Sequence, residues 1–274
     1  MTKHRRALRL AAGLIFTVAG CTDRPVDAPA PPPSASVEPP LPSTNKYDQP
    51  FNEAVTNEVG PDQQPPPDRT IAGKSTARLR EAVERAWPTI RLAEAGRPLS
   101  WVVTLDTDLG PIEIALRPGL APNHVRNFLA LVQVGYYDGL RFDRIVHQEA
   151  EAPDGTRSEI RLVRFGCAAG TGDPGVGHLG YRLRSEFSDV KHEAGTVGFT
   201  RDADPSSAGV RVYITLAPAP VLDGSYTIVG RISKGMDVVE KIASGKLLPA
   251  DDDPTRELPE KPVVISKATA RLDP

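Results

Sequence analysis

Apolar and polar positions first follow a regular period near residue 75 of the 274-residue chain. From there to residue 90, apolar side chains such as Leu79 and Val83 recur at the spacing of one helix face. Ser75 or Thr76 can cap this helix, and Pro88 should end or kink it. The pattern predicts a helix ahead of the first strand, within a helical extension over residues 73–98.

Beyond residue 98 the pattern changes to short apolar runs separated by glycine-rich turns. Strands are predicted over residues 101–107, 112–116, 159–165, 195–200, 210–216, 227–232 and 263–268, and helices over residues 122–134 and 235–242. Many short strands with two helices favour a mainly β fold, a closed antiparallel β-barrel with the helices over its ends. This domain is predicted to cover residues 99–274.

Residues 22–70 follow neither period and hold 13 of the 28 prolines of the chain. Few large apolar residues occur there, so the segment cannot bury enough surface to offset its chain entropy. We therefore expect a disordered, partly polyproline tether over residues 21–72. Tyr47 and Phe51 are candidates for a binding motif within it, but a plain spacer is favoured.

The first twenty residues have the pattern of an export signal. Four cationic side chains accompany an apolar run over residues 10–19 that is too short to span a bilayer. The segment Val18-Ala19-Gly20-Cys21 resembles the lipobox of bacterial lipoproteins, which implies cleavage before Cys21 and a lipid on its thiol. An ordinary secretion signal with a chance cysteine is the alternative. We expect a cell-envelope protein that is lipid-anchored to a bacterial membrane and faces the periplasm or the exterior.

Charge and composition disfavour several classes of function. The formal net charge of −2 argues against a nucleic-acid partner, which normally requires a basic face. His147, Glu149 and Glu151 lie on a polar segment without a fourth partner, so no metal site is expected. Residues 170–175 match G-x-G-x-x-G, but a proline and further glycine stand where a phosphate site needs a helix.

One stretch indicates a family. Residues 121–144, APNHVRNFLALVQVGYYDGLRFDR, join an amphipathic helix to a turn and to a strand that ends in an arginine. Together with residues 218–224 and 226–230, this stretch resembles the cyclophilin family of peptidyl-prolyl cis/trans isomerases. The resemblance covers about residues 101–272. It implies a closed barrel that acts on proline-containing peptides or exported proteins without a cofactor.

The chemistry of this activity requires few residues. Rotation about an X–Pro bond crosses a barrier of about 18–20 kcal/mol, because the twisted imide loses its resonance. An apolar pocket for the proline ring and a fixed donor near the imide nitrogen are needed, and arginine is such a donor at any working pH. The resemblance places Arg144 of Phe142-Asp143-Arg144 in the catalytic position, with a surface salt bridge as its alternative role.

The resemblance also implies which side chains line the substrate groove. Tyr213 keeps an aromatic floor, and Val163 and Leu222 complete the pocket for the ring. Phe165 and Arg211 stand where the family has substrate-contacting glutamines. The predicted substrate contacts are Phe142, Leu162, Val163, Phe165, Thr200, Arg211, Tyr213, Leu222 and Tyr226.

Two functions remain open at this point. The first is a prolyl isomerase that assists the folding of exported proteins at the envelope, which the retained Arg144 and Tyr213 favour. The second is a catalytically weakened module that binds a peptide or a partner protein, which the altered lining favours. A polar, hairpin-like insertion over residues 147–158 separates Arg144 from the lining residues that follow it.

Overall fold

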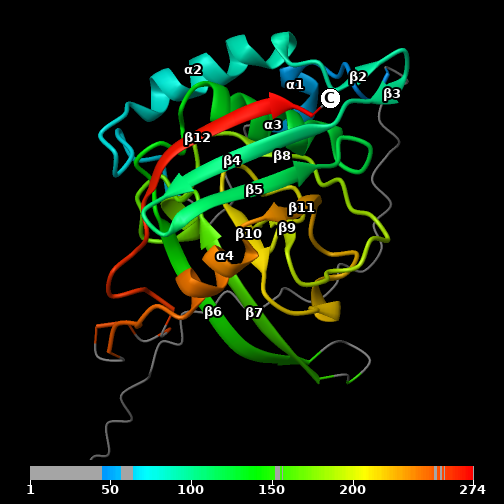
Figure 1. Ribbon diagram of the computed structural model, residues 1–274. Coiled ribbons are helices and arrows are strands. Elements are labelled where there is room, and N and C mark those ends of the chain that lie inside the picture. The colour runs from blue at the N-terminus through cyan, green and yellow to red at the C-terminus, as the bar shows by residue number, and fades with distance from the viewer. Residues whose placement is uncertain are drawn as a thin grey trace, which may run out of the picture.

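A computed structural model describes residues 45–56, 64–151, 155, 157–249, 252–253, 255 and 257–273 (Figure 1). The predicted export signal over residues 1–20 and the predicted lipid attachment site, Cys21, lie outside the described residues. Within the described part, no helix has both the length and the apolar character needed to cross a membrane.

Eight antiparallel strands form the main sheet, which confirms the mainly β class (Figure 1). They are β4 (Trp101–Thr107), β5 (Gly110–Leu116), β6 (Phe142–Glu151), β7 (Arg157–Phe165), β9 (Thr196–Phe199), β10 (Val212–Thr215), β11 (Ile228–Lys234) and β12 (Ile265–Leu272). Their order is β12-β4-β5-β11-β9-β10-β7-β6. The two outer strands, β12 and β6, are not joined by a ladder. Instead, an isolated bridge between Arg141 and Val264 links the segments that precede them.

Three longer helices accompany this sheet. They are α2 (Thr76–Ala86), α3 (Pro122–Gln133) and α4 (Met236–Ala243). The structure confirms the predicted start of α2, because the Ser75 side chain accepts a hydrogen bond from the Arg78 backbone N–H at 3.5 Å. Its α-helical geometry gives way to a 3₁₀ turn at Trp87, next to Pro88. Helix α2 packs on α3, α3 packs on β12, and α4 packs on β5, β6 and β7.

Short elements complete the fold. They are α1 (Phe51–Ala54), β1 (Val55–Thr56), β2 (Ala93–Glu94), β3 (Arg97–Pro98), β8 (Arg182–Leu183), η1 (Trp87–Thr89), η2 (Pro174–Val176) and η3 (Pro220–Leu222).

Part of the predicted tether is instead folded onto the domain. Strand β1 pairs with β8, and the Phe51 ring meets the rings of Trp87 and Tyr181 edge-on, with centroids 5.3 Å away in each case. The two aromatic residues of this segment supply the apolar surface that its proline content appeared to exclude. Tyr47 and Phe51 are therefore used within the chain's own core.

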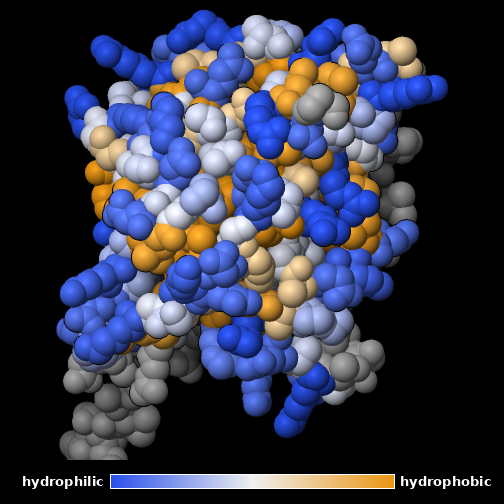
Figure 2. Space-filling model, viewed as in Figure 1, coloured by the Kyte–Doolittle hydropathy of each residue, from blue (hydrophilic) through white to orange (hydrophobic). Residues whose placement is uncertain are grey.

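The predicted insertion forms the outer half of a β-hairpin. Strands β6 and β7 pair without interruption from Arg144↔Arg164 to Glu151↔Arg157. Figure 1 shows that this two-stranded ribbon projects beyond the rest of the sheet. Its side chains alternate, with exposed charged residues on one face and more buried, less polar residues on the other. Figure 2 shows hydrophilic residues where the ribbon projects, whereas apolar patches occur higher on the same view.

Two apolar clusters fill the fold. The main core contains most buried side chains, including Phe128, Val163 and Phe165, which are all fully buried. A separate cluster lies along β6, β7 and β10, and we call it the second cluster. It consists of Val146, Ile160, Leu162, Tyr213, Ala219 and Leu222, with Ala150, Val221 and Tyr226 packed against it.

Candidate active site

Strand register brings one row of side chains together across β6, β7 and β10. Arg144 lies directly opposite Arg164, and Arg164 lies opposite Tyr213. Two residues further along each strand, Val146 lies opposite Leu162. Residues two apart in a strand share a face, so the two arginines and the second cluster occupy the same side of the sheet.

The second cluster provides an apolar floor beside these arginines. Leu162, Tyr213 and Leu222 pack together there, and each is less than 10% exposed. The Tyr226 ring meets the Tyr213 ring at a centroid distance of 5.9 Å, with the two planes nearly perpendicular. The Arg201 guanidinium lies over the Tyr226 ring, 4.7 Å from its centroid. Four of the predicted substrate contacts are thus close neighbours.

The Arg144 guanidinium is held on one side only. Its Nη1 donates to Thr255 Oγ1 at 2.8 Å and to Glu257 Oε2 at 3.3 Å. Among the described residues, Nη2 makes no hydrogen bond, and 13% of the side chain is exposed. Gly172 lies so close that any side chain there would clash with Arg144. The guanidinium therefore has a fixed end and an end that can donate to another molecule.

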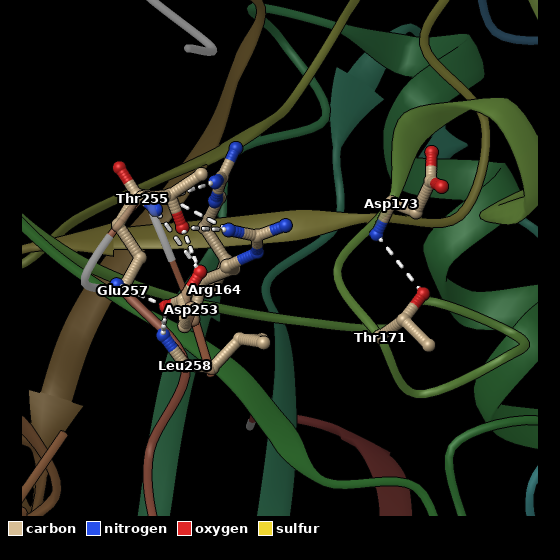
Figure 3. Close-up of polar contacts among 8 residues, drawn as sticks. Arg164, Thr171, Asp173, Asp253, Thr255, Glu257 and Leu258 are labelled. Carbon is tan, nitrogen blue, oxygen red and sulfur yellow. Dashed lines mark hydrogen bonds and ion pairs between the residues drawn. The ribbon is translucent and has the colours of Figure 1, made fainter. Parts of the chain in front are cut away.

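Two further guanidiniums on this face already have carboxylate partners. Arg164 Nη2 lies 3.0 Å from Glu257 Oε2, and Figure 3 shows these two residues beside Thr255. Arg211 Nη2 donates to Asp202 Oδ1 at 2.7 Å. Both arginine side chains are buried. Their charges are compensated inside the chain.

Three predicted contacts lie elsewhere. Phe142, Val163 and Phe165 are fully buried in the main core, away from the second cluster. A register shift between Phe142 and Arg144 moves the pairing by one residue, so that Arg164, not Val163, lies opposite Arg144. Thr200 is buried, and its backbone N–H donates to the Arg211 carbonyl at 3.0 Å.

A buried hydrogen-bonded chain anchors the aromatic floor. His192 Nδ1 lies 2.9 Å from Asp223 Oδ1, and its Nε2 lies 2.7 Å from the Tyr213 hydroxyl oxygen. Burial lowers the pKa of His192 and raises that of Tyr213, so the imidazole is neutral and the hydroxyl keeps its proton. With His192 Nδ1–H donating to Asp223, the Tyr213 hydroxyl donates a hydrogen bond to Nε2. This arrangement fixes the tilt of the Tyr213 ring.

Sequence reasoning did not find His192 or Glu257. Neither belongs to a recognisable motif, and each meets its partner only after folding: Glu257 is 113 residues from Arg144, and His192 is 21 residues from Tyr213. The leucine-aspartate-glycine turn that holds Asp223 was visible, but the histidine that it contacts was not.

The Asp143 side chain lies in a buried environment, unlike that of its neighbour Arg144. It is 3% exposed, and its Oδ2 accepts a hydrogen bond from the Cys167 backbone N–H at 3.1 Å. Burial raises the pKa of this carboxyl to about 6, although the hydrogen bond and the nearby arginines oppose the rise. Asp143 is therefore a buried acid that titrates in the mildly acidic range.

The projecting hairpin carries the residues considered as metal ligands. His147 Nε2 contacts the Glu159 carboxylate on the neighbouring strand. In the described ranges, no three histidine, cysteine, aspartate or glutamate side chains converge as a metal site would require.

A mainly β domain with an arginine beside a buried apolar floor agrees with one protein family. The family model for cyclophilin type peptidyl-prolyl cis-trans isomerases matches residues 102–270. The chain belongs to this family.

Similar proteins carry the same family name. A peptidyl-prolyl cis-trans isomerase of Arabidopsis thaliana is 35% identical over 143 residues, which are 52% of this chain and 80% of the relative. A probable peptidyl-prolyl cis-trans isomerase of Brucella suis biovar 1 is 35% identical over 160 residues, or 57% of this chain and 78% of the relative.

Solved structures support the fold. The crystal structure of a cyclophilin type peptidyl-prolyl cis-trans isomerase of Cryptosporidium parvum gives a TM-score of 0.52 at 20% identity, and covers 64% of this chain and 99% of its own. That protein was also crystallised in the presence of the dipeptide Ala-Pro.

We predict that Asp143→Asn removes a pH-dependent loss of stability. Because the folded-state pKa is raised from 3.8 to about 6, the folded protein binds this proton more tightly than the unfolded chain does. The contribution of Asp143 to stability is therefore fully present below pH 4 and is lost as the pH rises through 6, by about 3 kcal/mol in total. In thermal unfolding from pH 4 to pH 7, the stability of D143N should rise relative to that of the wild type. A stability difference that is constant across this range would contradict the prediction.

We predict that Tyr213→Phe destabilises the fold although the ring is retained. The change leaves His192 Nε2 buried without its donor, which costs about 1–3 kcal/mol. Urea denaturation measures the loss. Tyr47→Phe is the matched control, because Tyr47 is also buried but its hydroxyl makes no hydrogen bond to the described residues. Equal stability of the two variants would show that the His192 contact contributes nothing.

Proposed function

We propose that this chain isomerises X–Pro bonds of exported proteins at the cell envelope, and that Arg144 is its catalytic residue. The observation that carries the proposal is the one-sided anchoring of Arg144. Its Nη1 is bound by Thr255 and Glu257, its Nη2 makes no hydrogen bond to the described residues, and its strand position shares a face with the second cluster.

The mechanism needs no cofactor and no proton transfer. As the X–Pro bond twists, resonance is lost and the imide nitrogen gains a lone pair. A guanidinium N–H that is already in place stabilises this lone pair in the transition state more than the planar ground state. Because Glu257 and Thr255 hold the other end, Arg144 loses little side-chain entropy when it donates.

The apolar floor supplies the second requirement. Tyr213, Leu222 and Leu162 would contact the proline ring, and the buried His192 holds Tyr213 in place. Burial of the ring would favour binding of proline over polar residues by roughly 25 cal/mol per Å² of apolar surface. The dipeptide Ala-Pro used with the Cryptosporidium parvum protein is a ligand of the same kind.

A binding module with weakened catalysis is the second candidate. The observation in its favour is Arg211, which stands where the resemblance places a substrate-contacting glutamine. Its guanidinium is already bound to Asp202 at 2.7 Å, and a side chain at Gly177 would clash with it. A neutral amide that contacts substrate is thus replaced by a group committed to the chain itself.

We further propose that the chain is a bacterial lipoprotein. The residues before Cys21 support this, because a cationic start, a short apolar run and small residues precede the cysteine. Acyl chains contribute about 0.8 kcal/mol per buried methylene group, so several chains hold a protein firmly to a membrane. The anchor would bring the isomerase close to proteins that emerge at the envelope.

We predict that Arg144→Ala lowers kcat/KM for X–Pro exchange by roughly 10²-fold or more, because the transition state loses its fixed donor. Arg144→Lys should recover part of the rate, since lysine keeps the positive charge but lacks the planar set of N–H donors of the guanidinium. Two-dimensional exchange NMR with an Ala-Pro peptide and the full chain measures the rate. Arg161→Ala, on the exposed face of the hairpin, should be unchanged.

Equal rates for the wild type and Arg144→Ala would contradict the catalytic role of Arg144. A peptide whose resonances shift on binding to the wild type, without faster exchange, would favour the binding module.

We predict that Cys21→Ser releases the protein from the membrane. The wild type expressed in a bacterium should sediment with membranes and carry acyl chains on its N-terminal cysteine, as read by mass spectrometry. The variant should appear in the soluble fraction, because it lacks the thiol that accepts the lipid. Membrane sedimentation of both forms would count against the lipid anchor.

A further inference from the structure

One carboxylate serves two guanidiniums at the site. Glu257 Oε2 lies 3.3 Å from Arg144 Nη1 and 3.0 Å from Arg164 Nη2. The side chains of Glu257, Arg164 and Arg144 are only 7%, 9% and 13% exposed. Charges so poorly solvated interact strongly, and each depends on its partner.

The two arginines would otherwise repel each other. They lie directly opposite on β6 and β7, where Cβ atoms are about 4.5–5.5 Å apart and like charges are destabilising. Glu257 lies between the guanidiniums and offsets this repulsion. Without it, Arg144 would be driven away from Arg164, and the direction of its free Nη2 would be lost.

The position of Glu257 is itself specified by hydrogen bonds. The Asp253 carboxylate accepts from the backbone N–H groups of Glu257 and Leu258, both at 2.7 Å, and from Thr255 N–H at 3.1 Å and Oγ1–H at 2.6 Å (Figure 3). These bonds lower the pKa of Asp253, although burial alone would raise it. The turn is thus built to present Glu257 and Thr255 together.

The same turn is tied to the strand that carries Arg144. The backbone N–H of Ile145, the next residue, donates to the Glu257 carbonyl at 2.8 Å. Backbone and side chain of Glu257 therefore both engage β6 at the same point. A shift of this turn would move the carboxylate and the strand together.

We propose that Glu257 is the positioning residue of Arg144. It binds Nη1 so that Nη2 faces the substrate, and it cancels the charge of Arg164. This inference rests on the proposed function, because it assigns a role within the same reaction. The competing role is a restraint, in which Glu257 keeps Arg144 from the substrate. The two roles predict opposite changes in rate when the carboxylate is removed.

The test compares Glu257→Ala, Glu257→Gln and the double variant Arg164→Gln/Glu257→Gln in the full chain. X–Pro exchange gives kcat/KM, and side-chain ¹⁵N NMR reports whether the two Nη atoms of Arg144 give separate signals. Glu260→Gln is the matched control. It lies on the same loop and also binds a cation, Lys246 at 2.8 Å, but does not contact Arg144.

Glu257→Ala should lower kcat/KM by about 10²-fold, as expected when a catalytic group is misplaced. The separate Arg144 signals should merge as its guanidinium begins to rotate, while Glu260→Gln changes neither readout. The double variant should recover much of the rate lost by Glu257→Gln, because it removes both members of the buried pair. A role in folding alone would reduce the folded fraction but would leave the separate Arg144 signals of the folded protein unchanged.

Unchanged or faster exchange in a folded Glu257→Ala protein would overturn the inference. Separate Arg144 signals that persist in that variant would overturn it as well. If the wild type itself does not accelerate exchange, the proposed function fails instead, and the ¹⁵N signals still decide whether Glu257 orders Arg144.

Discussion

The site depends on the alternation of side chains along β6, β7 and β10. Successive residues point to opposite faces, so Val163 and Phe165 enter the main core while Leu162 and Arg164 face the second cluster. The register shift beside Asp143 brings Arg144 onto the same face. A slip of one residue would exchange the apolar and charged faces, so core packing fixes the geometry of the site.

This alternation also explains the opposite environments of two neighbouring residues. Asp143 is turned into the protein, where burial raises the pKa of its carboxyl to about 6. Arg144 lies on the face of the second cluster, where Glu257 and Thr255 hold one end of its guanidinium. Two adjacent residues of the strand therefore place a carboxyl in the interior and a partly exposed guanidinium on the opposite face.

Local sequence patterns predicted the helices and strands well, because hydrophobic periodicity and helix capping depend only on residues close together in the chain. Strand β4 matches its predicted range, and α2 begins at the predicted cap. The packing of residues 45–56 was missed, since Phe51 meets Trp87 and Tyr181 only in the folded chain. The burial of Val163 and Phe165 in the main core could not be predicted for a related reason. An insertion hides the register, and only the pairing of β6 with β7 and of β7 with β10 restores it.

The buried arginines beside the second cluster are linked to carboxylates from other parts of the chain. Arg164 and Arg211 each bring a buried positive charge, and each forms an ion pair, Arg164 with Glu257 and Arg211 with Asp202. Removal of Glu257 would take away the carboxylate that contacts both Arg144 and Arg164 on adjacent strands, which is costly in a poorly solvated site. The loop that carries Glu257 and the strand that carries Arg164 therefore depend on each other electrostatically, although 93 residues separate them in the chain.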